Sequence, residues 1–253
     1  PHDSIVQHYE QRFTGDKTWG GDQGSRYNPV DAIHTQFAAM VTRLDTQVGE
    51  ILDLLRNRGL AENTIVFFTS DNGPHREGGA DPAFFNTQGL LRGIKRTTYE
   101  GGIRVPFIAW CPGTIPSGVV SSLPITFYDM MPTFCELAGI ENYEERYRNP
   151  RTDYTDYFDG ISIAPTLLGE EGQQLHPHLY WELGEANVLA VRRGDWKLVV
   201  RHGVPELYNL ATDPHEDHDV KEQHPQVLKE LVDIVYQEHV DNPLFPISLP
   251  PRD

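Results

Sequence analysis

The sequence predicts an α/β protein, followed along the chain by a small α+β subdomain with an antiparallel sheet. Two patterns lead to this expectation. A long amphipathic helix runs directly into a strand that is apolar on both faces, and several short strands separated by glycine-containing turns follow later. Of the 253 residues, 38% are hydrophobic, which is enough to bury a core of this size. We therefore expect two domains, residues 1–175 and residues 176–253.

The clearest helix signal lies within residues 28–58. Asn28 or Asp31 can cap its start, and Gly59 follows its end. Apolar residues recur inside it at spacings of three and four and form one stripe, which consists of Ile33, Phe37, Val41, Leu44, Val48, Ile51 and Leu55. This pattern predicts a long helix that packs on one side.

A continuous β-branched and aromatic run, residues 64–69, follows this helix and is typical of a central parallel strand buried on both faces. It ends in a turn with the sequence Ser-Asp-Asn-Gly-Pro at residues 70–74. A second strand of the same kind is predicted at residues 105–110. Because α/β sheets bind ligands at the carboxyl ends of their strands, the polar turn marks a candidate site.

The remaining elements complete the two predicted domains. A helix is expected over residues 127–138, and a polar surface excursion over residues 141–160. Four short strands predict an antiparallel meander, at residues 179–182, 188–192, 196–201 and 206–209. A last amphipathic helix is expected over residues 225–238, and the proline-rich residues 241–253 should be irregular.

The charge balance excludes two classes of partner. The sequence has 37 acidic and 21 basic residues, a formal net charge of −16. Such a surface repels phosphate backbones and anionic lipids, so we expect neither nucleic acid nor a membrane as partner. No apolar run reaches the length of about 18 residues that a membrane span needs. An anionic substrate would need a local positive site, such as a metal ion beside Lys or His.

Several conspicuous polar or reactive residues have an ordinary structural interpretation. Cys111 and Cys135 lack metal-type spacing and are too few for a disulfide framework, so we expect two small buried hydrophobic residues. The charged run at residues 213–219 is interpreted as a solvated loop. His176 and His178 flank a proline before a strand and are expected in a linker rather than as a ligand pair.

Two stretches place polar residues and glycine where a core would have apolar side chains: residues 71–75 and residues 93–106. Asp71 and Asn72 offer two side-chain oxygens on a tight turn, and such donors suit Ca²⁺ or Mg²⁺ rather than Zn²⁺. Asp-Asn-Gly is also an ordinary turn sequence, so the residue chemistry leaves both interpretations open. For His75, substrate contact and simple loop polarity are both open.

Together, these motifs resemble the second half of the sulfatase family, of the arylsulfatase and N-acetylgalactosamine-6-sulfatase type within the alkaline phosphatase superfamily. The resemblance rests on Ser-Asp-Asn-Gly at residues 70–73, on Lys95, and on Tyr-Glu-Gly-Gly-Ile-Arg-Val-Pro at residues 99–106. Other stretches agree in order and spacing, namely Pro1-His2 with Tyr9 and Phe13, residues 129–140, residues 159–162, and residues 206–210 with Asp213, Pro214 and Glu216.

The resemblance implies an alkaline-phosphatase-like sheet with flanking helices and a smaller C-terminal antiparallel subdomain. It also implies hydrolysis of sulfate esters with Ca²⁺, with Mg²⁺ as the second candidate metal, and a formylglycine made from the Cys or Ser of a C/S-x-P-x-R motif. Asp71 and Asn72 would be metal ligands, and Asp71 would also take a proton in catalysis. His2 and Lys95 would contact the sulfate and act in catalysis. His75, at the mouth of the site, would contact the substrate.

The resemblance places the family's nucleophile motif in the N-terminal half, ahead of the stretches that match here. Cys111 lies in Cys-Pro-Gly, and residues 122–126 have Thr126 where the motif requires Arg, so neither is taken as the nucleophile. We therefore expect this chain to be the C-terminal part of a longer protein, whose missing N-terminal half supplies the formylglycine and the first pair of calcium-binding aspartates. The chain alone should be inactive.

The resemblance also implies the partners and the location. The substrate would be a sulfated sugar or other sulfated small molecule, the macromolecular partner would be the missing N-terminal half, and the protein would be periplasmic or secreted. Two alternatives stay open: a phosphoester or phosphonate hydrolase of the same superfamily, and a non-catalytic fragment that keeps the fold. The phosphoester relatives typically have His where Asn72 stands and bind zinc, so Asn72 favours calcium and sulfate.

Overall fold

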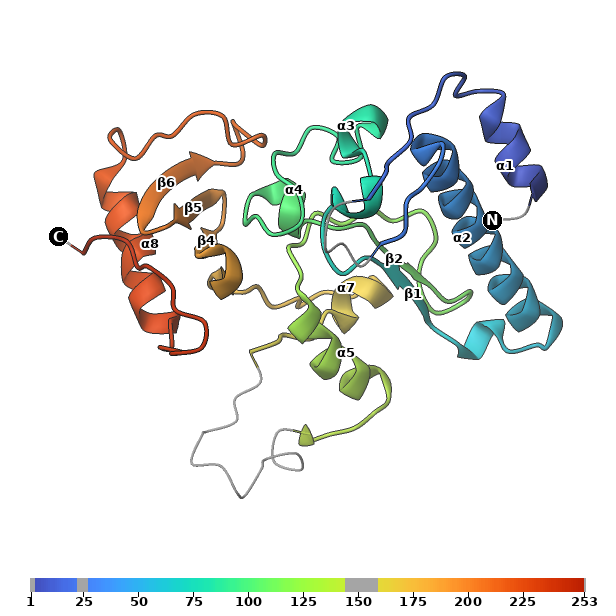
Figure 1. Cartoon of the computed structure of the whole chain (residues 1–253). Helices are drawn as coiled ribbons and strands as arrows, with labels where there is room; N and C mark the ends of the chain where they lie inside the picture. Colours follow the sequence, from blue (N-terminus) through green and yellow to red (C-terminus); the bar gives the residue numbers. More distant parts are fainter. Residues whose placement is uncertain (1–2, 22–26, 144–158, 253) are drawn as a thin grey trace. The chain divides into compact units, whose positions relative to one another are not determined.

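The computed structural model describes residues 3–21, 27–143 and 159–252 (Figure 1). In it the chain divides into two compact units. Both units are discontinuous in sequence. The first consists of Pro1–Leu54, Thr69–Pro106 and His178–Asp253, and the second of Leu55–Phe68 and Phe107–Pro177. The predicted domain division at residues 175 and 176 stays a prediction.

Two helices begin the first unit, α1 (Asp3–Glu10) and α2 (Ile33–Asn57). The latter confirms the long helix expected within residues 28–58. Its apolar stripe is only partly covered, since Val41 and Leu44 are about half exposed. Within the described ranges, no helix is both long and apolar enough to cross a membrane.

Three short helical segments follow Thr69 in the first unit: η2 (Glu77–Gly79), α3 (Pro82–Phe85) and α4 (Glu100–Ile103). Asp81 caps α3, because its Oδ1 accepts a hydrogen bond from the Phe84 amide at 3.2 Å. Proline directly after this cap matches the preferred start of a helix.

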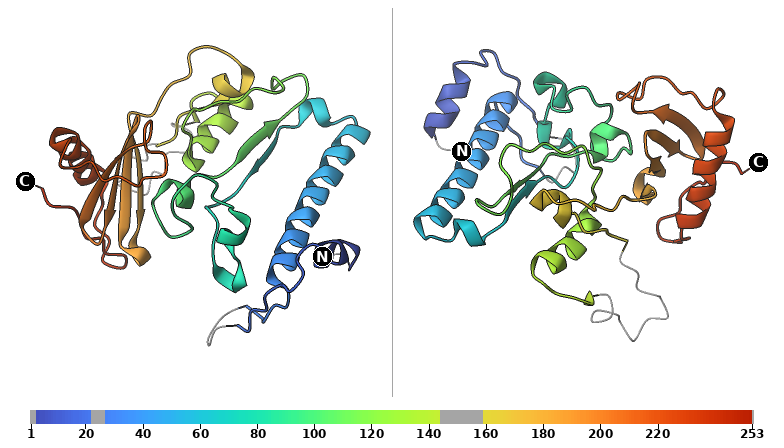
Figure 2. Two further views of the ribbon diagram at one scale, coloured as in Figure 1. Left: turned by 90° about the horizontal axis from the view of Figure 1, so that it is seen from above. Right: turned by 180° about the vertical axis from the view of Figure 1, so that it is seen from behind.

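The C-terminal part of the first unit is an antiparallel sheet with one helix on it, which confirms the predicted meander. The sheet has the order β3-β4-β5-β6, and its strands are Leu179–Leu183, Val188–Arg193, Trp196–Arg201 and Val204–Asn209. A short turn of helix, η4 (Gly184–Ala186), joins the first two strands. Helix α8 (Pro225–Glu238) lies along one face of the sheet (Figure 2).

The two faces of this sheet have different partners because successive side chains point to opposite sides. One face packs against α8, and its buried core contains Leu189, Val191, Leu198, Val200, Leu207, Leu231, Ile234 and Val235. The other face presents Ala190, Val199 and Tyr208 to the buried ring of Tyr99. The sheet is therefore buried on both faces, and one of them contacts the segment that leads into α4.

The second unit contains a two-stranded sheet, β1 (Val66–Thr69) and β2 (Phe107–Trp110). Phe67 packs against Phe107 at 5.5 Å and against Phe134 at 5.7 Å between ring centroids. The predicted strand at residues 64–69 is confirmed, but its expected burial on both faces is wrong, since all four of its residues are half-buried. A two-stranded sheet leaves an open edge beside each strand.

Short helices precede and follow these two strands along the chain: η1 (Ala61–Asn63) comes before β1, and η3 (Phe127–Asp129), α5 (Met130–Leu137) and α7 (Ala164–Leu168) come after β2. The expected helix over residues 127–138 is thus confirmed. Cys111 and Cys135 are free and buried, as predicted. Most of the expected polar excursion, residues 144–158, lies outside the described residues.

Candidate functional site

The Asp-Asn turn (residues 70–75) directly follows β1 and is held by the backbone of α4. The amide of Gly73 donates a hydrogen bond to the Gly102 carbonyl at 2.9 Å. A Cβ atom on Gly73 would lie only 1.9 Å from the Gly101 carbonyl oxygen. Because no side chain fits in that space, glycine is required for the turn to approach α4 this closely.

Asp71 and Asn72 present two oxygen atoms that the turn does not use. The side-chain amide nitrogen of Asn72 donates to the Gly73 carbonyl at 2.9 Å, which orients the side chain and leaves its carbonyl oxygen as an acceptor. Asp71 is exposed, and its Oδ1 lies 3.5 Å from the Ser70 hydroxyl. Among the described residues, neither Asn72 Oδ1 nor Asp71 Oδ2 has a hydrogen-bond partner.

The donor set of the Asp-Asn turn fits a hard cation, because carboxylate and amide oxygens are the ligands that Ca²⁺ and Mg²⁺ prefer. Two side chains are too few to complete such a site, since Ca²⁺ takes about six to eight oxygen ligands. In the part of the chain that the structure describes, no group of three His, Cys, Asp or Glu side chains could hold a metal. Metal ligation by Asp71 and Asn72 stays a prediction.

Lys95 lies next to the Asp-Asn turn through its backbone, because its amide donates to the Pro74 carbonyl at 2.8 Å. Its ammonium group is paired with Glu77, whose Oε2 lies 3.3 Å from Lys95 Nζ. The side chain is 30% exposed. Lys95 is therefore a paired cation at the edge of the turn and not a freely solvated loop lysine.

Glu77, which sequence reasoning did not single out, receives three donors. The Tyr27 hydroxyl donates to its Oε2 at 3.0 Å, and Arg96 Nη1 donates to its Oε1 at 2.5 Å, in addition to Lys95. These hydrogen bonds, the Tyr27 one first, lower the pKa of the Glu77 carboxyl to about 2. Glu77 therefore stays an anion beside Lys95 throughout the neutral range.

The low pKa of Glu77 predicts an acid-dependent loss of stability. The folded-state pKa of Glu77 lies below the ordinary value of 4.5. The stabilisation of the folded state by this carboxylate is therefore fully present above about pH 4.5 and is lost as the pH falls toward about 2. The Glu77→Gln variant should lose less unfolding free energy than the wild type over this window, measured by urea denaturation at each pH. Glu171→Gln, at an exposed carboxylate, is the matched control; an equal change in both variants would contradict the assignment.

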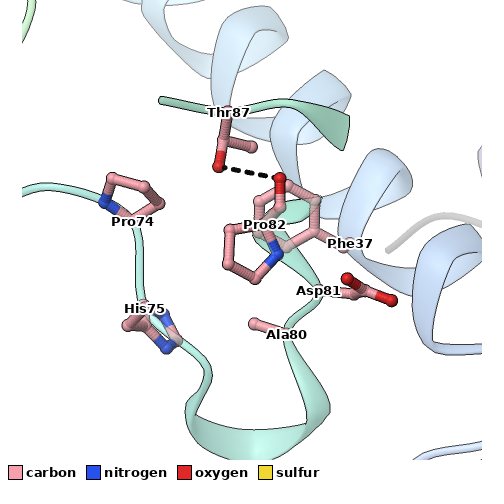
Figure 3. A pocket seen from close by; sticks show the side chains of 7 residues that line it. All are labelled: Phe37, Pro74, His75, Ala80, Asp81, Pro82 and Thr87. Carbon is pink, nitrogen blue, oxygen red and sulfur yellow. Dashed lines mark hydrogen bonds between the residues drawn. The ribbon is translucent and has the colours of Figure 1, made fainter. Parts of the chain in front are cut away.

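His75 lies at a small, almost wholly apolar recess of about 70 Å³. Its Nδ1 accepts a hydrogen bond from the Glu77 amide at 3.0 Å, so only Nε2 is left for another partner. The recess is also lined by Phe37, Pro74, Ala80, Asp81, Pro82 and Thr87 (Figure 3). A substrate contact by His75 stays a prediction.

A buried histidine that sequence reasoning missed anchors the wall of this recess. The ring of His34 has Nδ1 2.6 Å from Asp16 Oδ1 and Nε2 3.3 Å from Asp81 Oδ2, and it stacks on Phe84 at 3.6 Å between ring centroids. The capping role of Asp81 is readable from the proline that follows it. Its pairing with His34 is not, because the two residues are 47 positions apart.

The structure joins some predicted site residues and leaves others apart. Backbone hydrogen bonds bring the Asp-Asn turn together with Lys95 and with α4. The Lys95 side chain contacts Glu77 rather than Asp71. His2 lies outside the described residues.

Comparisons with known proteins point to one family. The family profile described as Sulfatase matches residues 1–140. The N-acetylgalactosamine-6-sulfatase of Mus musculus is 36% identical over 171 residues, which cover 66% of this chain and 29% of that protein. Arylsulfatase A of Homo sapiens is 32% identical over 229 residues, which cover 77% of this chain and 41% of that protein. The chain thus spans less than half the length of these relatives.

Solved structures give the same result for the fold. A sulfatase from Pseudoalteromonas sp. aligns with a TM-score of 0.63 and 27% identity over 79% of this chain and 41% of that chain. The phosphonate monoester hydrolase of Agrobacterium radiobacter, at 23% identity and a TM-score of 0.56 over 87% of this chain and 46% of that chain, shares the fold alone. The predicted alkaline-phosphatase-like α/β fold is confirmed. Because the Sulfatase profile covers more than half of the residues of this chain, the chain belongs to the sulfatase family.

Proposed function

We propose that the complete protein hydrolyses sulfate esters of a sulfated sugar and that this chain supplies part of the metal and sulfate site. The observation that carries the proposal is the orientation of Asn72. Its amide nitrogen is engaged with the backbone, so its carbonyl oxygen is left as an acceptor, and Asp71 is the next residue in the same turn. A carboxylate and an amide oxygen on consecutive residues of a turn at the end of a strand suit a divalent cation that binds a sulfate.

In this proposal Asp71 and Asn72 hold Ca²⁺, with Mg²⁺ as the second possible metal. The bound cation would supply positive charge to the sulfate oxygens. Asp71 would also hold a proton taken from the nucleophile, a formylglycine that a preceding segment of the protein would contribute. Without that segment, the chain should have no turnover of its own.

Lys95 would offset negative charge that builds on the sulfate in the transition state, the largest kind of catalytic contribution in many enzymes. In the structure this lysine pairs with Glu77, whose lowered pKa keeps the carboxylate charged and the ammonium group at the edge of the turn. His2, or Lys95 itself, would give a proton to the departing alcohol, and His75 would contact the sugar.

Metal dependence is the first test of this proposal. We expect chelation with EDTA to reduce release of inorganic sulfate from sulfated glycosaminoglycan saccharides to background, and added Ca²⁺ to restore it. Asn72→Ala should raise the Ca²⁺ concentration for half-maximal activity at least about 10–100-fold, the loss seen even for outer partners of metal ligands. The readout is sulfate release by the complete protein, against calcium concentration.

The same assay separates the rival functions. Cleavage of a phosphonate monoester with Zn²⁺, without release of sulfate from any sulfated saccharide, would overturn the proposal in favour of a phosphonate hydrolase. No turnover of either substrate would favour a non-catalytic protein.

We further propose that the complete protein acts in the periplasm or is secreted, as the sulfatase resemblance implies.

A further inference from the structure

A buried ion cluster joins α4 to the C-terminal sheet. Lys197 of β5 is fully buried, and its Nζ lies 2.7 Å from Glu100 Oε1 and 2.9 Å from Glu216 Oε1. Glu216 is fully buried as well, and its Oε2 accepts a hydrogen bond from the Glu100 amide at 2.7 Å. Residues 213–219 were expected to form a solvated loop, and at Glu216 that expectation is wrong, because Lys197 compensates its charge inside the protein.

Such a cluster is expensive to bury. Removing each charge from water is unfavourable, and a partner offsets this only with good geometry. Burial also raises the pKa of the Glu216 carboxyl. Apolar side chains of similar volume often stabilise a protein interior as well as a buried ion pair does. The cluster is therefore poorly explained by the stability of the subdomain alone.

The cluster holds the lysine segment (residues 92–102), which carries Lys95. At the start of this segment, Arg92 Nη1 donates to the Glu216 carbonyl at 2.5 Å, and the guanidinium lies 4.1 Å from the centre of the Tyr99 ring. The Tyr99 hydroxyl donates to Glu206 Oε2 at 2.5 Å. One side of the lysine segment is thus fixed on the C-terminal sheet at several points.

The lysine segment also holds the Asp-Asn turn. The amide of Lys95 donates to Pro74, and the carbonyl of Gly102 accepts from Gly73. A displacement of the lysine segment would therefore move Lys95, the candidate sulfate contact, together with Asp71 and Asn72, the candidate metal ligands. All of these contacts lie within the first compact unit.

We propose that Glu100, Lys197 and Glu216 are positioning residues of the candidate site: they fix the lysine segment, and through it Lys95 and the Asp-Asn turn. None of the three takes part in the chemistry proposed above. The catalytic consequence rests on the proposed function, whereas the mechanical coupling of the cluster to the turn does not depend on it.

The test uses a charge-balanced variant, Lys197→Met/Glu216→Gln, which removes one positive and one negative charge. The remaining Glu100 keeps Arg192, whose Nη1 lies 3.5 Å from Glu100 Oε2. Replacing both partners of a buried ion pair by neutral residues often leaves stability unchanged. We therefore expect a melting temperature near that of the wild type. Lys229→Met, at an exposed pair with Asp233 on α8, is the matched control.

The first readout is amide hydrogen exchange, which needs no substrate. In the double variant, the amides of Gly73 and Lys95 should exchange at least about tenfold faster, because local opening of the turn becomes easier. The amide of Ala39 in α2 should be unchanged. The second readout is kcat for sulfate release by the complete protein, which should fall about 10- to 100-fold with little change in KM, as expected when catalytic groups are misplaced.

A folded double variant with wild-type exchange and wild-type kcat would overturn the proposal and leave the cluster a purely structural one. Faster exchange in a protein that has no sulfatase activity even as wild type would contradict the proposed function but not the coupling. If the double variant does not fold, Glu100→Gln, which keeps the shape of the side chain, is measured in its place. Unchanged exchange in that variant would overturn the proposal equally, and Lys229→Met should match the wild type in both readouts.

Discussion

The Lys95→Ala variant of the complete protein is expected to hydrolyse a sulfate ester about 10²–10³-fold more slowly than the wild type, the loss measured when a single preorganised electrostatic contact is removed. The fold should be unaffected, because the side chain is partly exposed and its ion pair with Glu77 lies near the surface. The measurement is kcat for sulfate release, together with a thermal melt of the same protein.

Arg96→Ala is the matched control for this variant. Arg96 binds the same carboxylate, Glu77, and is 56% exposed, but it is the neighbour of the proposed sulfate contact. We expect near-wild-type turnover from it. Equal losses in both variants would assign the effect to disturbance of Glu77, and wild-type kinetics of Lys95→Ala would remove Lys95 from the mechanism.

The Gly73→Ala substitution is expected to have the largest effect on stability, lowering the unfolding free energy by about 3 kcal/mol, the upper part of the range for overpacked sites. The added Cβ would lie 1.9 Å from the Gly101 carbonyl oxygen, and this neighbour is backbone that cannot rotate away. The Asp-Asn turn would have to leave α4. Urea denaturation followed by circular dichroism measures the change.

Gly49 provides the control for this substitution. It lies inside α2, and a Cβ atom there would meet nothing within 4 Å. Gly49→Ala should therefore be neutral or stabilise the protein by up to about 1 kcal/mol, because alanine favours the helix. If both substitutions have the same effect, the close approach of the turn to α4 is not what makes Gly73 necessary.

Local patterns in the sequence predicted the elements of the fold. The helix within residues 28–58 follows from apolar spacings of three and four, and the strands after residue 175 from short strand-like runs separated by glycine-containing turns, both of which a sequence displays directly. The burial of β1 was overestimated because a sequence does not show how many strands lie beside it. The family resemblance, rather than periodicity, singled out Asp71, Asn72 and Lys95.

Contacts between distant residues could not be predicted in this way. Lys197 lies 97 positions from Glu100, and Glu216 stands in a charged run whose composition is typical of solvated loops. Only the approach of β5 makes that glutamate an internal residue. Glu77 was missed for a related reason, since the carboxylate that pairs with Lys95 is 18 positions away, at the start of the short segment η2.

The residues of the buried ion cluster lie far apart along the chain, and this separation limits how early the protein can fold during its synthesis. Glu100 and Glu216 are 116 positions apart, so at about 5–20 residues per second a ribosome needs about 6–23 s between them. During this interval the lysine segment has neither its ionic partner nor the sheet that covers Tyr99. Folding of the first unit therefore cannot finish until β5 and Glu216 have been made, and its completion should follow the synthesis of residue 216.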